Sequence, residues 1–167
     1  ATNQNQSVVN KQIMGIVVGA ALAVALSLID YHRILSFSTV IYLACSGILG
    51  AVLVMGRSRG IARRWIVLPV IGQIQPAEFV KIGLILFFSW YFAKYQEKRN
   101  QFSTLGIAAV LFAIPAFLIF KQPNLSTTLI TTVIIVAVVF ASGVSYKWIL
   151  GVLAAVIPAG ALMIYLM

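Results

Sequence analysis

The sequence predicts an all-α fold, a polytopic bundle of transmembrane helices, from its composition and from the lengths of its apolar runs. Of the 167 residues, 62% are hydrophobic and only 9% are charged, and the mean hydropathy is +1.04. Ordinary soluble domains are about 45–50% apolar and about 25% charged. A chain so poor in charge cannot cover its own surface in water, so we expect that surface to face lipid.

Six stretches reach or approach the roughly 20 mostly apolar residues that a spanning helix needs. They cover residues 13–31, 33–55, 76–95, 102–120, 125–143 and 147–167. Most breaks between them are short, which predicts antiparallel neighbours in one transmembrane domain over residues 1–167. The polar start ATNQNQSVVNKQ has no apolar core, so we expect a loop that follows an upstream segment rather than a signal peptide.

The net charge of +9 and the scarcity of cysteine and histidine narrow the function classes. In a membrane protein, basic residues outside the spans meet lipid headgroups or anionic lipid-linked substrates, so we expect membrane lipids and no nucleic acid as partners. A single Cys45 and a single His32 exclude a disulfide within the chain and predict no metal centre. Asp30, beside Tyr31 and Arg33, is expected to act as a structural cap or ion-pair partner.

The one long connection, residues 56–75, reads GRSRGIARRWIVLPVIGQIQ and carries four arginines. The apolar residues that follow these arginines, from Trp65, predict a short segment lying in the membrane interface. The arginines themselves have two interpretations. They anchor the loop to headgroups, which the sequence alone favours, or they recognise a phosphate or pyrophosphate, for which guanidinium groups are well suited.

Glu78 and Lys81 are ionisable residues at the start of the third apolar stretch, where charge is costly and indicates function. Their i,i+3 spacing puts them on one helix face, where they can pair. The pair either reaches out to headgroups or lies inside a cavity of the bundle, and we favour the cavity. A carboxylate at this position is also stabilised by the helix dipole.

The fifth stretch opens with hydroxyl side chains one turn apart, at Thr127 and Thr131 and at Thr128 and Thr132. Hydrogen bonding between helices explains this pattern, and lining of a polar groove is the alternative.

Three motifs follow one another along the chain: GIARRWI at 60–66, QPAEFVK at 75–81 and KQPNLSTT at 121–128. They resemble the G-A-x-R-W-I, Q-P-S-E-x-x-K and Q-P-D-L-G-T motifs of the shape, elongation, division and sporulation (SEDS) family of RodA, FtsW and SpoVE. Asp30-Tyr31 also resembles this family's Asp-Tyr at the cytoplasmic end of a span. The resemblance covers essentially the whole chain, which corresponds to about the second to seventh spans, the N-terminal half of such a protein.

This resemblance implies a peptidoglycan glycosyltransferase of cell elongation or division, a multi-pass protein of the bacterial plasma membrane. Such enzymes polymerise lipid II, undecaprenyl pyrophosphate leaves, and a class B penicillin-binding protein is the usual partner. By this analogy Arg63 or Arg64 and Lys81 bind the pyrophosphate, and Glu78 holds Lys81 or shapes the cavity. The third motif adds Gln122 and Asn124 as substrate-binding candidates.

Two features limit what the resemblance implies. The third motif has Asn124 in place of Asp and Ser126 in place of Gly, so a role that needs negative charge at 124 does not carry over. The aspartate regarded as catalytic in this family belongs to a loop beyond residues 1–167. We therefore expect this fragment to be inactive alone. Whether a divalent cation accompanies the substrate pyrophosphate stays open.

Two other functions compete with the enzyme. A lipid II transporter needs a continuous polar path, and these spans show no charge in mid-membrane. A non-catalytic scaffold for a penicillin-binding protein needs only a surface that docks its membrane helix.

The orientation of the Arg-rich connection is testable, because basic residues divide almost evenly between the two sides and leave the positive-inside rule undecided. The family topology puts this connection outside the cell. We expect Arg59→Cys, in a Cys45→Ser background, to react with a membrane-impermeant maleimide on intact cells. Lys98→Cys in the same background should stay unlabelled. The reverse pattern would reject the predicted orientation.

Overall fold

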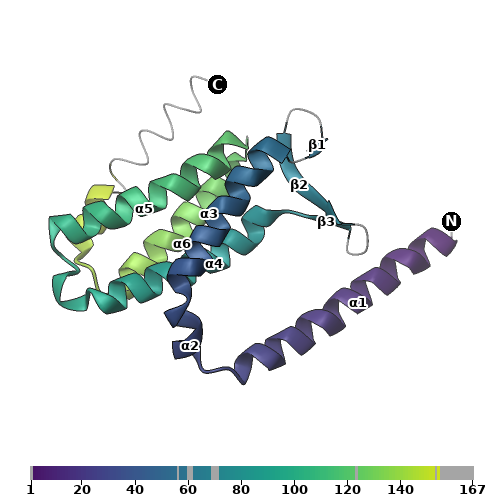
Figure 1. Cartoon of the computed structure of the whole chain (residues 1–167), viewed down its shortest axis with the longest axis horizontal. Coiled ribbons are helices and arrows are strands. Elements are labelled where there is room, and N and C mark those ends of the chain that lie inside the picture. Colours follow the sequence, from purple (N-terminus) through teal and green to yellow (C-terminus); the bar gives the residue numbers. More distant parts are fainter. Residues whose placement is uncertain are drawn as a thin grey trace. The chain divides into compact units, whose positions relative to one another are not determined.

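The computed structural model describes residues 2–55, 57–59, 62–68, 72–122, 124–152 and 154 (Figure 1). These fall into two units, Ala1–Ser36 and Phe37–Met167, and each is described by itself. The predicted single domain over 1–167 stays a prediction.

The first unit contains α1 (Thr2–Ser27) and α2 (Tyr31–Ser36). The predicted N-terminal loop is wrong, because α1 begins at Thr2. Residues 2–12 contain no glycine or proline, and their glutamines and lysine are good helix formers, so nothing local stops the helix. The predicted capping role of Asp30 is confirmed: its Oδ1 accepts from the backbone N–H of His32 at 3.0 Å and lies 2.9 Å from the His32 ring Nδ1.

The second unit is a helix bundle of α3 (Ser38–Met55), α4 (Pro76–Lys94), α5 (Phe102–Lys121) and α6 (Leu125–Ala141). A short 3₁₀ turn, η1 (Gln96–Lys98), follows α4. The stretch expected at 33–55 is interrupted at Phe37, between α2 and α3. Of the last expected span, residues 147–152 and 154 are helical, and its remaining residues lie outside the described part.

Among the described helices, α4 and α5 are long and apolar enough to cross a membrane. Three more stretches, Gln12–Ser27, Ser38–Val54 and Leu125–Ala141, are apolar helices of shorter length. Together with the packing below, these helices confirm the predicted class, a polytopic bundle of transmembrane helices.

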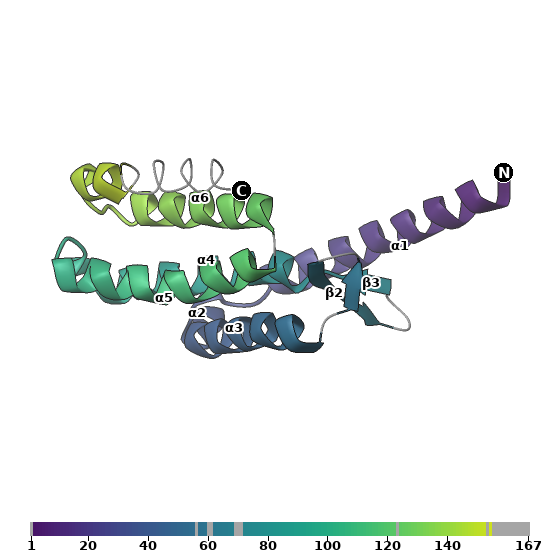
Figure 2. The same ribbon diagram turned by 90° about the horizontal axis from the view of Figure 1, so that it is seen from above.

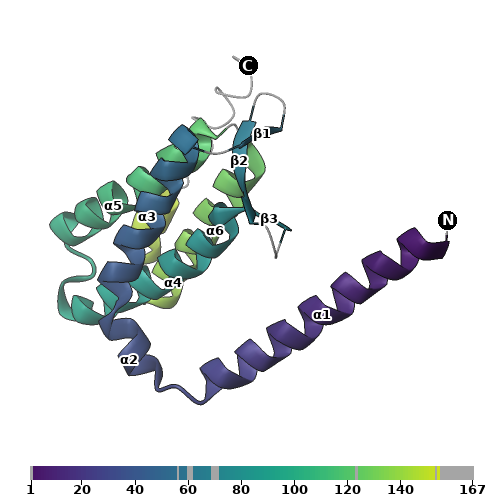
Figure 3. The ribbon, with the colours of Figure 1, turned by 45° about the vertical axis from the view of Figure 1, so that its right-hand side comes forward.

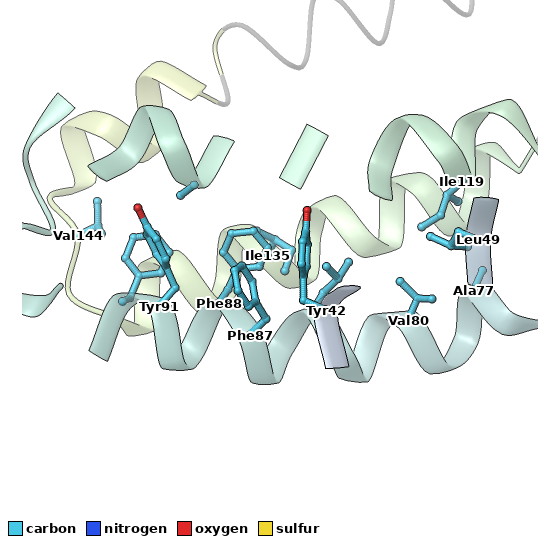
Figure 4. Packing of buried hydrophobic residues seen from close by; sticks show 13 residues of the cluster. Tyr42, Leu49, Ala77, Val80, Phe87, Phe88, Tyr91, Ile119, Ile135 and Val144 are labelled. Atoms are coloured by element: carbon cyan, nitrogen blue, oxygen red, sulfur yellow. The ribbon is translucent and has the colours of Figure 1, made fainter. Parts of the chain in front are cut away.

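Helices α4 and α5 each contact both α3 and α6, which lie on opposite sides of them in Figure 2. Aromatic side chains fill the middle. The rings of Tyr42 and Phe87 stack with their centroids 4.4 Å apart, and Phe88 of α4 meets Phe112 of α5 edge-on at 6.3 Å. Figure 4 shows Tyr42, Phe87 and Phe88 together in this layer. Such contacts matter because lipid supplies no hydrophobic force between helices, so packing must hold them together.

The connection between α3 and α4 contains three short strands, β1 (Arg57–Arg59), β2 (Ala62–Leu68) and β3 (Gly72–Ile74). They form an antiparallel sheet in the order β1-β2-β3, so the all-α prediction missed this element. The β-branched and aromatic residues of the run from Trp65 favour extended backbone. The predicted interfacial position of this segment stays a prediction.

Close packing of α3 against α4 depends on Gly83. A Cβ at Gly83 would lie 2.6 Å from Sγ of Cys45 and 3.2 Å from Cγ2 of Ile41. Real Cβ atoms do not approach this closely, so the two helices would have to move apart.

We expect Gly83→Ala to destabilise the purified chain by about 1–3 kcal/mol, the usual cost of overpacking. Adding Cys45→Ala should recover most of this loss, because it removes the sulfur. Gly106→Ala is the matched control, since a Cβ at that α5 position meets nothing within 4 Å. Thermal unfolding in detergent measures all three variants, and equal midpoints for Gly83→Ala and Gly106→Ala would contradict the packing described.

Candidate functional site

The ends of four helices meet at one end of the bundle, where α3 and α5 finish and α4 and α6 begin. Their side chains form a closed layer: Leu49 and Ile119 are fully buried, and Ala77 and Val80 are at most 1% exposed. Figure 4 shows these four residues at the same end of α4. The sheet lies at this end too, because β2 contacts both α3 and α4 (Figure 3). The candidate residues lie at this end of the bundle, next to the buried layer.

Glu78 and Lys81 form the ion pair that their spacing predicts. Lys81 Nζ donates to Glu78 Oε2 at 2.8 Å. The Lys81 side chain is only 16% exposed, whereas that of Glu78 is 54% exposed. Pro76 begins α4 and leaves Glu78 in its first turn, where the helix dipole favours a carboxylate. The protein therefore covers most of the Lys81 side chain, while the ion pair stays open to the surroundings through Glu78, and its predicted place in a cavity stays a prediction.

Gln122 and Asn124 flank the turn from α5 to α6, and both are buried. Gln122 Nε2 donates to the backbone oxygen of Leu49 at 3.3 Å, which ties the end of α5 to α3. Asn124 is the N-cap of α6, and its Oδ1 accepts from the backbone N–H of Thr127 at 3.3 Å. Both amides thus have structural partners, and their predicted part in substrate binding stays a prediction.

The α6 threonines bond within their own helix, not between helices as predicted. The hydroxyls of Thr128, Thr131 and Thr132 donate to the carbonyls of Asn124, Thr127 and Thr128. A buried threonine satisfies its hydroxyl this way because the carbonyl four residues back is always within reach. Thr131 is fully buried, so it does not line an open groove.

Arg63 and Arg64 lie in β2, the strand that contacts the start of α4. In the β1–β2 register Arg63 pairs with Ser58, and a bulge between Arg57 and Ser58 leaves Arg64 without a partner in β1. The structure thus brings the backbone of both arginines to the end of the bundle that carries Glu78 and Lys81. Arg63 and Arg64 in this strand, together with Lys81 in the first turns of α4, make a set of cations suited to an anion with several negative charges.

The described residues bring no three His, Cys, Asp or Glu side chains together. They do not fit a metal held by several side chains of the protein. A divalent cation that arrives with a pyrophosphate substrate stays a prediction.

Sequence reasoning missed the polar contacts at the opposite end of the bundle. Arg99 Nη1 donates to the backbone oxygen of Ser142 at 3.3 Å, and Asn100 Oδ1 accepts from the backbone N–H of Ser145 at 2.8 Å. These bonds join the α4–α5 connection to the turn that follows α6. Adjacent Arg and Asn in a short loop are the only local signal, and their partners more than forty residues away could not be inferred from it.

Comparisons with known proteins agree over the length of the chain. Residues 1–167 match the family model of FtsW, RodA and SpoVE, described as "Cell cycle protein". A probable peptidoglycan glycosyltransferase FtsW of Thiomicrospira cyclica is 31% identical over 94% of this chain and 40% of its own length. The chain therefore spans about two fifths of that relative.

Two solved structures have a similar fold. The rod shape determining protein RodA of Thermus thermophilus gives a TM-score of 0.72 at 28% identity, over 87% of this chain and 48% of that one. A second structure, titled "Structural coordination of polymerization and crosslinking by a peptidoglycan synthase complex", gives 0.73 at 27% identity. That match covers 91% of this chain and 45% of the other.

The cap at Asn124 gives a stability prediction. Asn124→Ala should lower the unfolding free energy by about 0.5–2 kcal/mol, because the first turn of α6 loses its acceptor. Asn124→Asp keeps an acceptor oxygen and should retain most of the stability. Gln101→Ala is the matched control, since Gln101 precedes α5 without a side-chain cap bond. If the midpoint of thermal unfolding in detergent shifts equally in Asn124→Ala and Gln101→Ala, the cap contributes nothing to stability.

Proposed function

Because this chain belongs to the FtsW, RodA and SpoVE family of integral membrane cell cycle proteins, we propose that it forms part of a peptidoglycan glycosyltransferase. In this proposal the enzyme polymerises lipid II during cell elongation or division. The main support is the alignment of 94% of the chain with a relative named as such an enzyme. The chain spans about two fifths of that relative, so the activity of the whole protein remains a proposal.

The chemistry of the proposed reaction assigns a part to each candidate residue. The acceptor sugar hydroxyl attacks the anomeric carbon of the donor, its proton goes to a general base, and the bond to the pyrophosphate breaks. Negative charge grows on the departing undecaprenyl pyrophosphate. Fixed cations stabilise that charge best where water is scarce. In this proposal the cations that stabilise the departing pyrophosphate are Lys81 and the two arginines of β2, Arg63 and Arg64.

Glu78 has a supporting part in this proposal. Its bond to Lys81 holds the ammonium at the start of α4, in the geometry seen at 2.8 Å. Without the carboxylate the Lys81 ammonium, on a side chain that is 16% exposed, would lose its described partner, and an unpaired charge costs more the more it is buried. The general base and any divalent cation that travels with the pyrophosphate are assigned to no residue of this chain.

A class B penicillin-binding protein is the proposed partner, and the bacterial plasma membrane is the proposed location. The similar structure titled as a peptidoglycan synthase complex supports such an assembly. Transport of lipid II is the weaker alternative, because the buried middle of the bundle is aromatic and aliphatic. A scaffold without catalytic activity is the other alternative, and it predicts no glycan synthesis by the full-length protein.

The first test uses residues 1–167 alone. Purified and mixed with fluorescent lipid II, this chain should leave only monomer on a gel, because we place the general base elsewhere. Glycan strands formed in the absence of another polymerase would show that this placement is wrong.

The second test uses Glu78→Ala and Lys81→Ala in a full-length family protein that carries these residues. An exposed ion pair contributes only about 0.2–1 kcal/mol, whereas removal of one partner of a buried pair costs about 3–5 kcal/mol. Each single variant should therefore lose polymerisation. The double variant should regain stability without activity. Lys98→Ala, at the other end of the bundle, is the control. Normal glycan synthesis by either single variant would return the pair to the interpretation in which it reaches out to headgroups.

A further inference from the structure

A polar hollow of about 280 Å³ lies between the C-terminal ends of α4 and α6. It is at the opposite end of the bundle from Glu78 and Lys81, and no step of the proposed reaction uses it. Polar residues line one part and apolar residues another: Ser89, Gln96, Arg99 and Ser142 in the first, Phe92 and Val138 in the second.

Arg99 supplies the charge of this hollow. Its Nη1 donates to the backbone oxygen of Ser142, and Gly143, with φ 76°, packs so closely that a Cβ there would lie 3.1 Å from the same nitrogen. The guanidinium is therefore held in place but uses only part of its donor capacity. No carboxylate lines the hollow among the described residues. An anion is the missing partner for this cation.

The end of α4 beside the hollow has side chains typical of the membrane interface. Lys94 ends α4, and its Nζ lies 4.9 Å from the ring centroid of Trp90 and 5.6 Å from that of Tyr95. Tryptophan, tyrosine and lysine together at the end of an apolar helix are typical of the boundary between the hydrocarbon core and the headgroups. A ligand here would have its charged part in the interface and its apolar part against the bundle.

We propose that this hollow binds the headgroup of an anionic glycerophospholipid. The phosphodiester accepts hydrogen bonds from Arg99 and Gln96, and the glycerol end lies against Phe92 and Val138. Lys94 and Lys98 raise the local positive potential and favour a lipid with net negative charge over a zwitterionic one. The proposal is independent of the glycosyltransferase assignment, because it concerns residues at the other end of the bundle.

Native mass spectrometry of the purified chain, titrated with phosphatidylglycerol or phosphatidylcholine, tests this proposal. We expect phosphatidylglycerol to bind about tenfold more tightly, and Arg99→Gln to reduce both its affinity and this preference, since the phosphodiester loses a charge-assisted hydrogen bond and the site loses one positive charge. Lys121→Gln removes the same charge at the other end of α5 and should keep the preference. Equal binding of the two lipids, or equal loss in both variants, would overturn the site.

A second variant separates the lipid site from the structural part of Arg99. Gln96→Leu leaves the Arg99–Ser142 contact intact and removes the second hydrogen-bond donor of the hollow, so it should reduce phosphatidylglycerol binding without lowering the unfolding midpoint. Unchanged binding in this variant would overturn the site. Inorganic phosphate serves as the headgroup-free probe. If it raises the midpoint as much as phosphatidylglycerol does, the site binds phosphate ions and the lipid assignment is wrong.

Discussion

Packing of α4 against its neighbours is the constraint on which the rest of the bundle depends. One helix supplies the largest share of the buried residues, and its aromatic rings reach α3 and α5. Gly83 permits the closest approach, because any side chain there would collide with Cys45. The two polar regions of the bundle stand at the two ends of this helix. Small changes in how α4 packs would therefore move both of them.

Hydrogen bonds between helices complement this packing. The hydroxyls of Tyr42 and Tyr91 donate to the carbonyls of Leu111 and Thr104, and Gln122 donates to Leu49. Each bond joins a side chain to the backbone of another segment. In the core of a bilayer no water is available as an alternative acceptor for such a donor. The bond therefore fixes one register of the two segments that it joins. Gln122 lies in the motif that resembles the family's Q-P-D-L-G-T, and its described contact is of this structural kind.

The two ends of the bundle carry cations in different settings. At the sheet end Lys81, whose side chain is 16% exposed, is paired with Glu78, and β2 carries Arg63 and Arg64. At the other end Arg99 faces a hollow without a carboxylate. A paired ammonium group suits a negative charge that appears only during a reaction. Its own carboxylate partner stabilises the ammonium before that charge forms and after the product leaves. An unpaired guanidinium suits a ligand that stays bound.

Local patterns in the sequence determined the helices, the Glu78–Lys81 pair and the cap at Asp30, because each depends on residues within a few positions of one another. The same local reasoning failed at residues 2–12, where polarity alone predicted a loop although nothing breaks the helix. Only the tertiary structure decided that Gln122 meets Leu49, that β2 lies beside the start of α4, and that Arg99 reaches Ser142. These contacts join segments far apart in the chain, and they exist only once the helices have packed.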